Sequence, residues 1–173
     1  MQATVSIHHD DHLIGSRDAA IVLVEYGDYQ CPYCRRAHAA VKDLQRRLGK
    51  QLLFVYRHFP LTNMHPYAEM AAEAAEAAGV QGRFWDMHDA LFALQPQFGP
   101  HLVADLADRM GIDHDVLLDD LKSRRFQPTV ERMAAEGTHL GAVQTPTFFI
   151  NGVLHEGDSD EASLATAIMR CVV

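Results

Sequence analysis

The sequence predicts an α/β fold in which a core of strands and helices is interrupted by a block of helices. Three features indicate this fold: a strand–helix–strand order early in the chain, a long middle stretch with helical spacing and no strand pattern, and a return to strands near the end. A strand–helix–strand unit with short connections gives parallel strands and a right-handed crossover. We therefore expect an arm at residues 1–12, an α/β domain made of residues 13–61 and 127–173, and a helical insertion at residues 62–126.

The first half of the core begins with a short, continuous apolar segment. Residues 21–24 (Ile-Val-Leu-Val) have no polar side, which is typical of a strand covered on both faces. From Pro32 to about Leu48 small and apolar residues recur at helical spacing, and Gly49 favours the end of a helix there. Residues 52–56 then predict the second strand of the unit.

The rest of the chain predicts several helices and one hairpin. Helices are expected at residues 67–78, 84–94, 102–110, 116–121 and from Pro128 to about residue 140. Asn151-Gly152 lies between two apolar segments and favours a tight hairpin turn. A last helix is expected from about Asp158, with Glu161 as its capping-box partner and with Leu164 and Ile168 buried.

Composition and charge exclude several classes of function. The 173 residues are 48% hydrophobic and 22% charged, which is typical of one ordinary globular domain. A net charge of -8 disfavours binding to nucleic acid or to an anionic membrane surface. No apolar segment approaches the roughly 20 residues that a membrane helix needs. The first residues lack the basic and apolar regions of a signal peptide. We therefore expect a cytoplasmic protein if the chain is complete, and a periplasmic or extracytoplasmic one if a leader has been removed.

The strongest chemical signal is the Cys31-x-x-Cys34 pair, which follows a strand and opens a helix. A thiolate attacks disulfides, and the backbone N–H groups at a helix N-terminus stabilise negative charge. Arg35 and Arg36 are expected to add positive charge, so that the pKa of Cys31 falls from about 8.5 into a range of roughly 3.5–7.5. Cys31 is then the nucleophile and Cys34 the resolving thiol. The alternative is that both are small buried residues without redox chemistry.

Two segments resemble the signatures of a known family. Residues 25–34 (EYGDYQCPYC) and 144–152 (QTPTFFING) are similar to those of DsbA-like thioredoxin-fold thiol–disulfide oxidoreductases. The resemblance extends over nearly the whole chain beyond the arm and includes the helical insertion. It implies a thioredoxin-like fold, with a central β-sheet flanked by helices, that acts on the thiols or disulfides of polypeptides. It also implies a redox partner and no metal or organic cofactor.

The resemblance assigns roles to individual residues. Pro146 matches a cis-proline beside the cysteine pair, and the backbone of Thr145 is expected to bind the extended substrate chain. Glu25 matches a buried acid below the pair, where burial would raise its pKa and allow it to relay the proton of Cys34. The alternatives are a trans proline that starts a strand and an acid that faces solvent.

Pro32 and Tyr33, between the cysteines, are expected to set the redox potential, but they leave the direction of the reaction open. Pro-Tyr also occurs in glutaredoxins, whereas the periplasmic oxidant of the family usually carries Pro-His. A glutathione-linked, glutaredoxin-like reductase is therefore one alternative function. A module in which the two thiols bind a soft ion such as Cu(I), or a chaperone, is another.

Other features are expected to be structural. The eleven histidines come without an HExxH motif, a second C-x-x-C or an acid cluster, so we expect no metal site; those considered are His8, His9, His12, His58, His65 and His88. Phe84, Trp85 and Phe92 are expected to join the insertion to the core. Cys171 is expected to be a free thiol without a redox role.

Overall fold

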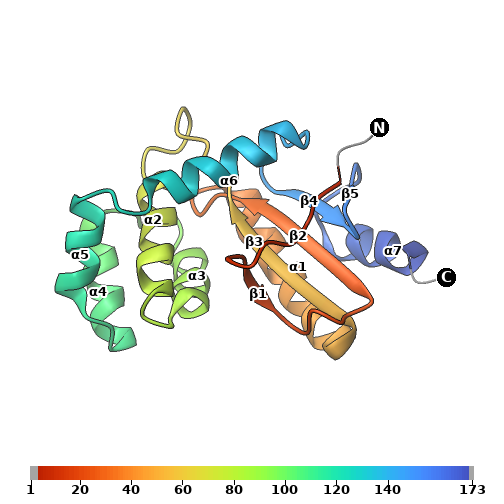
Figure 1. Cartoon of the computed structure of the whole chain (residues 1–173), viewed down its shortest axis with the longest axis horizontal. Coiled ribbons are helices and arrows are strands. Elements are labelled where there is room, and N and C mark those ends of the chain that lie inside the picture. Colours follow the sequence, from red (N-terminus) through yellow and green to blue (C-terminus); the bar gives the residue numbers. More distant parts are fainter. Residues whose placement is uncertain (1–3, 172–173) are drawn as a thin grey trace.

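The computed structural model describes residues 4–171 and has a five-stranded sheet with helices on both faces (Figure 1). The strand order is β1-β3-β2-β4-β5. Its strands are β1 (His12–Ile14), β2 (Ile21–Gly27), β3 (Leu52–His58), β4 (Thr147–Ile150) and β5 (Val153–Leu154). Strands β2 and β3 run parallel, as expected, and β4 is antiparallel to β2. Within the described residues, no helix combines the length and apolar character needed to cross a membrane.

Helix α1 (Pro32–Leu48) connects the two parallel strands and begins where the sequence predicts. Cys31 is its N-cap residue and Pro32 lies in its first turn, where a missing N–H costs no hydrogen bond. The helix ends at Gly49, whose φ of 51° favours glycine, and a short 3-10 turn (Gly49–Gln51) leads into β3. Val41 and Leu44 are buried on the helix face that packs in the main core.

The middle of the chain forms four helices at one end of the sheet (Figure 1). These are α2 (Ala68–Gly79), α3 (Phe84–Ala93), α4 (Pro100–Met110) and α5 (His114–Lys122). Helix α2 is almost entirely buried because its small alanine side chains let the neighbouring helices approach from several sides. Phe84 and Phe92 are buried in the core that the insertion shares with α1 and β3. Trp85 packs on Phe54, with ring centroids 5.9 Å apart. The prediction that these aromatic residues join the insertion to the core is confirmed.

Helix α6 (Gln127–His139) covers the face of the sheet opposite to α1 (Figure 1). A second apolar cluster lies beneath it, formed by alternate residues of the central strands such as Val24 and Val55. Gly137 is necessary for this packing, because a Cβ atom there would lie 2.8 Å from the Tyr26 ring and 2.9 Å from the Phe59 ring. The two apolar clusters explain why the central strands have no polar side.

The C-terminal part agrees with the sequence except at one helix start. Asn151 and Gly152 have φ values of 47° and 84°, so the predicted hairpin turn is confirmed. Helix α7 (Glu161–Cys171) begins later than Asp158. The predicted capping-box role of Glu161 is wrong, because the Asp160 carboxylate accepts the hydrogen bond from the Ser163 N–H (2.8 Å).

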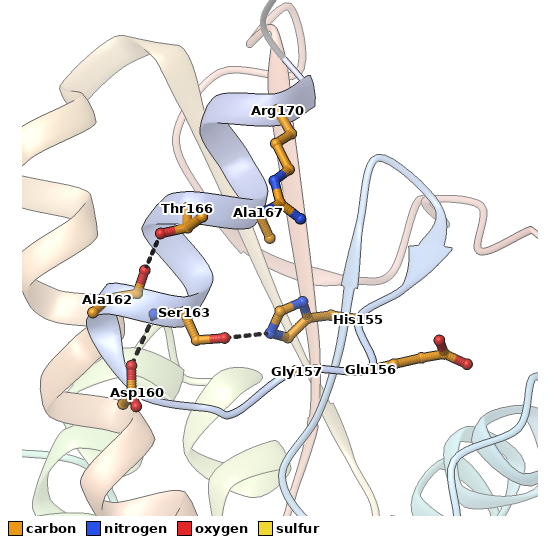
Figure 2. A pocket seen from close by; sticks show the side chains of 9 residues that line it. All are labelled: His155, Glu156, Gly157, Asp160, Ala162, Ser163, Thr166, Ala167 and Arg170. Carbon is orange, nitrogen blue, oxygen red and sulfur yellow. Dashed lines mark hydrogen bonds between the residues drawn. The ribbon is translucent and has the colours of Figure 1, made fainter.

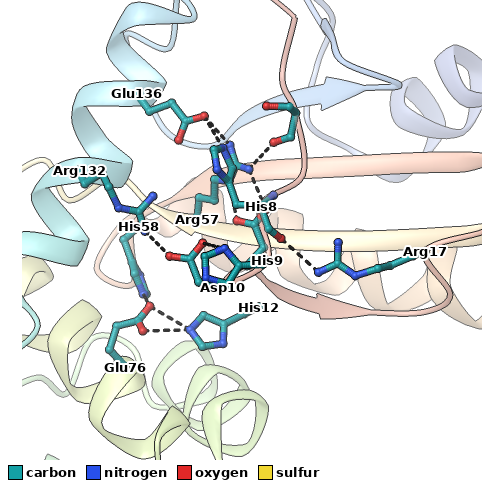
Figure 3. Close-up of polar contacts among 12 residues, drawn as sticks. His8, His9, Asp10, His12, Arg17, Arg57, His58, Glu76, Arg132 and Glu136 are labelled. Carbon is teal, nitrogen blue, oxygen red and sulfur yellow. Dashed lines mark hydrogen bonds and ion pairs between the residues drawn. The ribbon is translucent and has the colours of Figure 1, made fainter.

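The N-terminal segment packs against the sheet through a buried arginine (Figure 3). Arg57 of β3 donates to both carboxylate oxygens of Asp11 at 2.8 Å, and also to Tyr26 Oη (2.8 Å) and Glu136 (3.1 Å). Both Arg57 and Asp11 are almost fully buried. The arginine thereby anchors the N-terminal segment, whose Val5 also joins the second apolar cluster. The chain then forms β1, a strand too short to be recognised in the sequence.

A second polar group fixes the start of β1 to the insertion (Figure 3). His12 and His58 both contact Oε1 of Glu76, at 3.0 and 2.9 Å. Burial of Glu76 opposes its ionisation, but the hydrogen bonds from the two histidines lower its pKa to about 2. The ring of His12 also stacks on Phe84, with centroids 3.5 Å apart. These histidines serve as hydrogen-bonding groups of the core.

Candidate active site

Cys31 and Cys34 lie at the N-terminus of α1, directly beyond the end of β2, and both are free thiols. Cys34 is fully buried, whereas Cys31 is 3% exposed. Cys31 lines a cleft of about 710 Å³ whose walls come from four loops. The cleft residues are Cys31, Pro32, Tyr33, Leu61, Met64, His65, Val143, Gln144, Thr145, Pro146, Gly157, Asp158 and Ser159. Only one of the two sulfurs therefore faces a space that a substrate could enter.

The environment of Cys31 lowers its pKa from 9.0 to about 5. The largest cause is a hydrogen bond from the Cys34 thiol; burial acts in the opposite direction. Hydrogen bonds from Thr145 and from the backbone N–H groups of Tyr33 and Cys34 lower it further. The backbone contribution is the effect of the helix N-terminus that the sequence predicts. Cys31 is thus a thiolate at neutral pH.

The two arginines that were expected to lower the pKa of Cys31 contact other groups. Arg35 donates a hydrogen bond to the carbonyl oxygen of Gln95 (3.2 Å), and the guanidinium of Arg36 lies over the Tyr33 ring at 4.5 Å. Neither is among the causes that lower the pKa of Cys31. That their charges help to activate Cys31 stays a prediction.

Behind the pair, Glu25 of β2 is buried at 1% exposure, as the sequence analysis expects. Burial and, to a lesser extent, the charge of Cys31 raise its pKa to about 8. The pKa of Cys34 is raised well above its usual value, chiefly by burial and then by its hydrogen bond to Cys31. The Asp28 backbone N–H donates to Cys34 Sγ (3.4 Å). The two thiols therefore differ sharply: Cys31 is ionised while Cys34 keeps its proton.

The loop before β4 lies next to Cys31 in the cleft. The Thr145–Pro146 peptide bond is cis, and the Cys31 thiol lies 3.4 Å from the Thr145 carbonyl oxygen. Both parts of this prediction, the cis bond and its position beside the pair, are confirmed. Tyr33 is 58% exposed at the rim of the cleft, next to Pro32. The structure thus brings every predicted site residue except the buried Glu25 and Cys34 to one cleft.

Three residues of the site were given no role in the sequence analysis, although Asp28 lies within the segment at residues 25–34. Asp28 and His65 form a hydrogen-bonded pair (2.8 Å) beside the cleft. Gln95, in the connection between α3 and α4, donates to the carbonyl oxygen of Cys31 (3.2 Å) and ties the insertion to the loop that carries the cysteine. A carboxylate, an imidazole and an amide at unrelated sequence spacings form no motif, so only the folded chain shows their roles.

A separate hollow lies between α7 and the segment after β5 (Figure 2). In it Ser163 Oγ lies 3.3 Å from His155 Nε2, and the Asp158 carbonyl oxygen is 3.0 Å from the same nitrogen. This histidine nitrogen thus contacts groups of residues that follow it closely in the sequence. Cys171, at the end of α7, is exposed. We assign these features to the structure of the C-terminal segment.

One group of side chains has the composition of a metal site. The potential ligand atoms of His38, His88 and Asp89 lie within 4.8 Å of one another. The ammonium group of Lys42 lies 2.8 Å from the Asp89 carboxylate, and Tyr29 Oη lies 3.0 Å from His88 Nδ1. A lysine already supplies positive charge to the Asp89 carboxylate, and Tyr29 contacts one nitrogen of His88, so we assign this group to the structure.

The chain is similar to thioredoxin-fold proteins. The profile of the family described as "Thioredoxin" matches residues 8–170. BdbD from Bacillus subtilis, in its oxidised form, has a TM-score of 0.88 at 24% identity, and 99% of this chain and 97% of that chain are covered. A thioredoxin-like oxidoreductase from Silicibacter pomeroyi has a TM-score of 0.84 at 28% identity, with 95% and 94% covered.

Curated relatives are much longer proteins. The Na(+)/H(+) antiporter NhaA 1 of Salinispora arenicola is 43% identical over 159 residues, and that of Mycolicibacterium vanbaalenii is 42% identical over 163 residues. The matches cover 91% of this chain but only 24% and 26% of those proteins. The chain therefore spans about a quarter of the length of the curated relatives that it matches.

Proposed function

Because the chain belongs to the thioredoxin family, we propose that it exchanges disulfides with polypeptide thiols through Cys31 and Cys34, by way of a mixed disulfide. Its fold and family are those of thiol–disulfide oxidoreductases. The observation that carries the finer proposal is the asymmetry of the pair. Cys31 faces the cleft with a pKa of about 5, whereas Cys34 is buried and protonated. One attacking sulfur and one resolving sulfur are what a mixed-disulfide mechanism requires.

We propose that the preferred direction is oxidation of substrate dithiols. A disulfide between Cys31 and Cys34 has no thiolate, so every interaction that stabilises the Cys31 thiolate favours the reduced pair. Reduction of the pair is the half-reaction that accompanies oxidation of a substrate. A redox partner must then remove the electrons to return the pair to the disulfide.

Glu25 is proposed to exchange the proton of Cys34. The Cys34 sulfur must lose its proton before it attacks a mixed disulfide, and its raised pKa makes this loss difficult in the absence of a base. Glu25 is buried behind the pair with a pKa of about 8, close to neutral pH. A group whose pKa lies near the working pH is suited to both accept and return a proton.

The substrate is proposed to lie along the loop that carries Thr145 and Pro146. This loop forms the wall of the cleft opposite Pro32 and Tyr33 and brings a backbone carbonyl to 3.4 Å from Cys31. An extended peptide placed there can hydrogen-bond with the Thr145 backbone while its own sulfur reaches Cys31. No metal or organic cofactor is needed for this chemistry.

The two alternatives receive less support. In a soft-metal site both sulfurs would bind the ion, whereas the proposed exchange needs no metal, so metal analysis of the purified protein is expected to find no Cu(I) or Zn²⁺ at the pair. A glutathione-linked reductase would turn over with glutathione as its only thiol. We expect polypeptide dithiols to react faster than glutathione. The name antiporter belongs to proteins of which this chain matches about a quarter. For this chain we propose only the disulfide chemistry.

A trapping experiment tests the proposal. The Cys34→Ser variant is incubated with a peptide disulfide, and disulfide-linked adducts are located by mass spectrometry. Adducts should accumulate on Cys31, whereas Cys31→Ser should trap nothing. Both variants carry Cys171→Ser, so that the exposed third thiol cannot contribute. Trapping through Cys34 would reverse the roles, and the absence of any adduct would contradict the function.

A further inference from the structure

A buried carboxylate holds a histidine at the edge of the cleft. Asp28 follows β2 and its side chain is fully buried. Its Oδ1 accepts a hydrogen bond from the Gln30 N–H (2.7 Å), and its Oδ2 accepts from the Leu61 N–H (2.8 Å) and contacts His65 Nδ1 (2.8 Å). Since a carboxylate oxygen accepts, Nδ1 of His65 carries the proton. The unprotonated nitrogen of the neutral ring is therefore Nε2.

The imidazole of this histidine lies on the substrate side of the site. His65 lines the same cleft as Cys31 and Pro146, and its side chain is 17% exposed. Among residues 4–171, no protein group forms a hydrogen bond with Nε2. The other titratable side chains that line the cleft are Cys31, Tyr33 and Asp158, with Asp28 behind the ring. His65 is thus the imidazole of the cleft, and it is oriented by a carboxylate.

The proposed reaction leaves a proton for such a group to accept. A substrate thiol has a pKa near 8.5 and is mostly protonated at neutral pH, yet only its thiolate attacks a disulfide. When Cys31 and Cys34 are joined as a disulfide, neither sulfur can act as a base. Glu25 lies behind the pair and is buried, so it serves Cys34. An imidazole with a carboxylate on its other nitrogen is a common arrangement for activating a nucleophile.

We propose that His65, oriented by Asp28, is the general base for the substrate thiol; this inference rests on the oxidising function proposed above. As His65 Nε2 takes the thiol proton, the substrate sulfur forms a bond to Cys31 Sγ. The Cys31–Cys34 bond breaks, and its electron pair leaves on Cys34 Sγ. The second substrate thiol then attacks the first, and Cys31 leaves as a thiolate. Of the two protons that the substrate loses, one ends on Cys34 and the other passes from His65 to water.

The test compares two classes of thiol as reductants of the oxidised protein. An alkyl thiol such as dithiothreitol needs a base at neutral pH, whereas thionitrobenzoate is already a thiolate there and needs none. In His65→Asn the amide can still donate to Asp28, but no titratable nitrogen faces the cleft. The rate with dithiothreitol should fall roughly tenfold to a hundredfold, while the rate with thionitrobenzoate should change less than about twofold. His114→Asn, which alters an acid-paired histidine on α5, is the matched control and should change neither rate.

The pH dependence of the unmodified protein gives a second readout that does not depend on the folding of a variant. If His65 takes the thiol proton, the dithiothreitol rate no longer follows the thiolate concentration and should rise clearly less than tenfold between about pH 7 and pH 8. In its absence the rate follows the thiolate concentration and rises about tenfold over that interval. A tenfold rise in the unmodified protein, or equal slowing of both reductants in His65→Asn, would overturn the role of His65. If neither reductant reacts with the unmodified disulfide, the oxidoreductase function itself is wrong.

Discussion

The hydrogen bond from Cys34 is the largest cause of the low Cys31 pKa, and this can be tested by its removal. A hydrogen bond to a charged group contributes about 1.5–3 kcal/mol, which corresponds to roughly one to two pKa units. In a Cys171→Ser background, Cys34→Ala should therefore raise the Cys31 pKa from about 5 to roughly 6–7. Cys34→Ser is the matched control, because its hydroxyl can still donate, and its Cys31 pKa should stay near 5.

The lowered pKa of Cys31 also affects the expected redox potential of the pair. At pH 7, a pKa of about 5 in place of 9.0 stabilises the reduced pair by roughly 2.7 kcal/mol, or about 60 mV for two electrons. Because the folded pKa is the lower one, this stabilisation is complete above pH 9 and is lost as the pH falls through 5. Ultraviolet absorbance of the thiolate, followed against pH, measures the pKa in each variant. Equal midpoints in the alanine and serine variants would refute the role of Cys34, and a midpoint near 9 in the serine variant would refute an activated Cys31.

Two further predictions concern stability. Glu25 has its pKa raised from 4.5 to about 8, so its contribution to stability is present below pH 4.5 and is lost as the pH rises towards 8. Glu25→Gln should therefore increase the free energy of unfolding by roughly 3 kcal/mol at pH 7 and change it little near pH 4. Denaturant melts at both pH values measure this change. Equal changes at the two pH values would contradict burial of the charge as the cause. Arg57→Met leaves Asp11 buried without its partner and should cost roughly 3–5 kcal/mol, whereas Arg57→Met with Asp11→Asn should cost less. Additive costs of the two substitutions in the same melts would show that the pair does not interact.

Local patterns in the sequence were sufficient for most of the fold. The apolar segment at residues 21–24, the Pro32 and Gly49 boundaries of α1 and the Asn151-Gly152 turn each depend on neighbouring residues only. Strand β1 could not be predicted, because it is three residues long and is held by pairing with β3 and by side chains from distant parts of the chain. The start of α7 was misplaced because three acidic residues, Asp158, Asp160 and Glu161, compete as caps, and only the backbone selects Asp160.

The candidate site likewise contains residues that the sequence predicts and residues that only the folded chain brings together. The cysteine pair and Pro146 were recognisable because they lie in motifs, and the burial of Glu25 followed from the apolar strand that carries it. The contacts of Arg35 and Arg36 could not be predicted, because sequence proximity does not say where a long side chain turns. The Asp28–His65 pair joins residues 37 positions apart, and no spacing rule connects them.

The site separates its two proton transfers in space, and this separation follows from the course of the chain. Glu25 and Asp28 lie at either end of one short segment, and between them β2 ends and the backbone leaves the sheet towards α1. The first acid is buried behind the pair, where its charge raises the pKa of Cys34. The second lies beyond the strand, where it turns His65 towards the cleft and towards an incoming thiol. On our proposals, substitution of Glu25 slows the attack of Cys34 on the mixed disulfide when the reduced pair reacts with a substrate disulfide. Substitution of His65 slows formation of the mixed disulfide when the oxidised pair reacts with a substrate thiol. When the reduced protein is mixed with a peptide disulfide, rapid quenching should thus find accumulated mixed disulfide in Glu25→Gln but not in His65→Asn; the same amount in both would show that a single proton path serves both sulfurs.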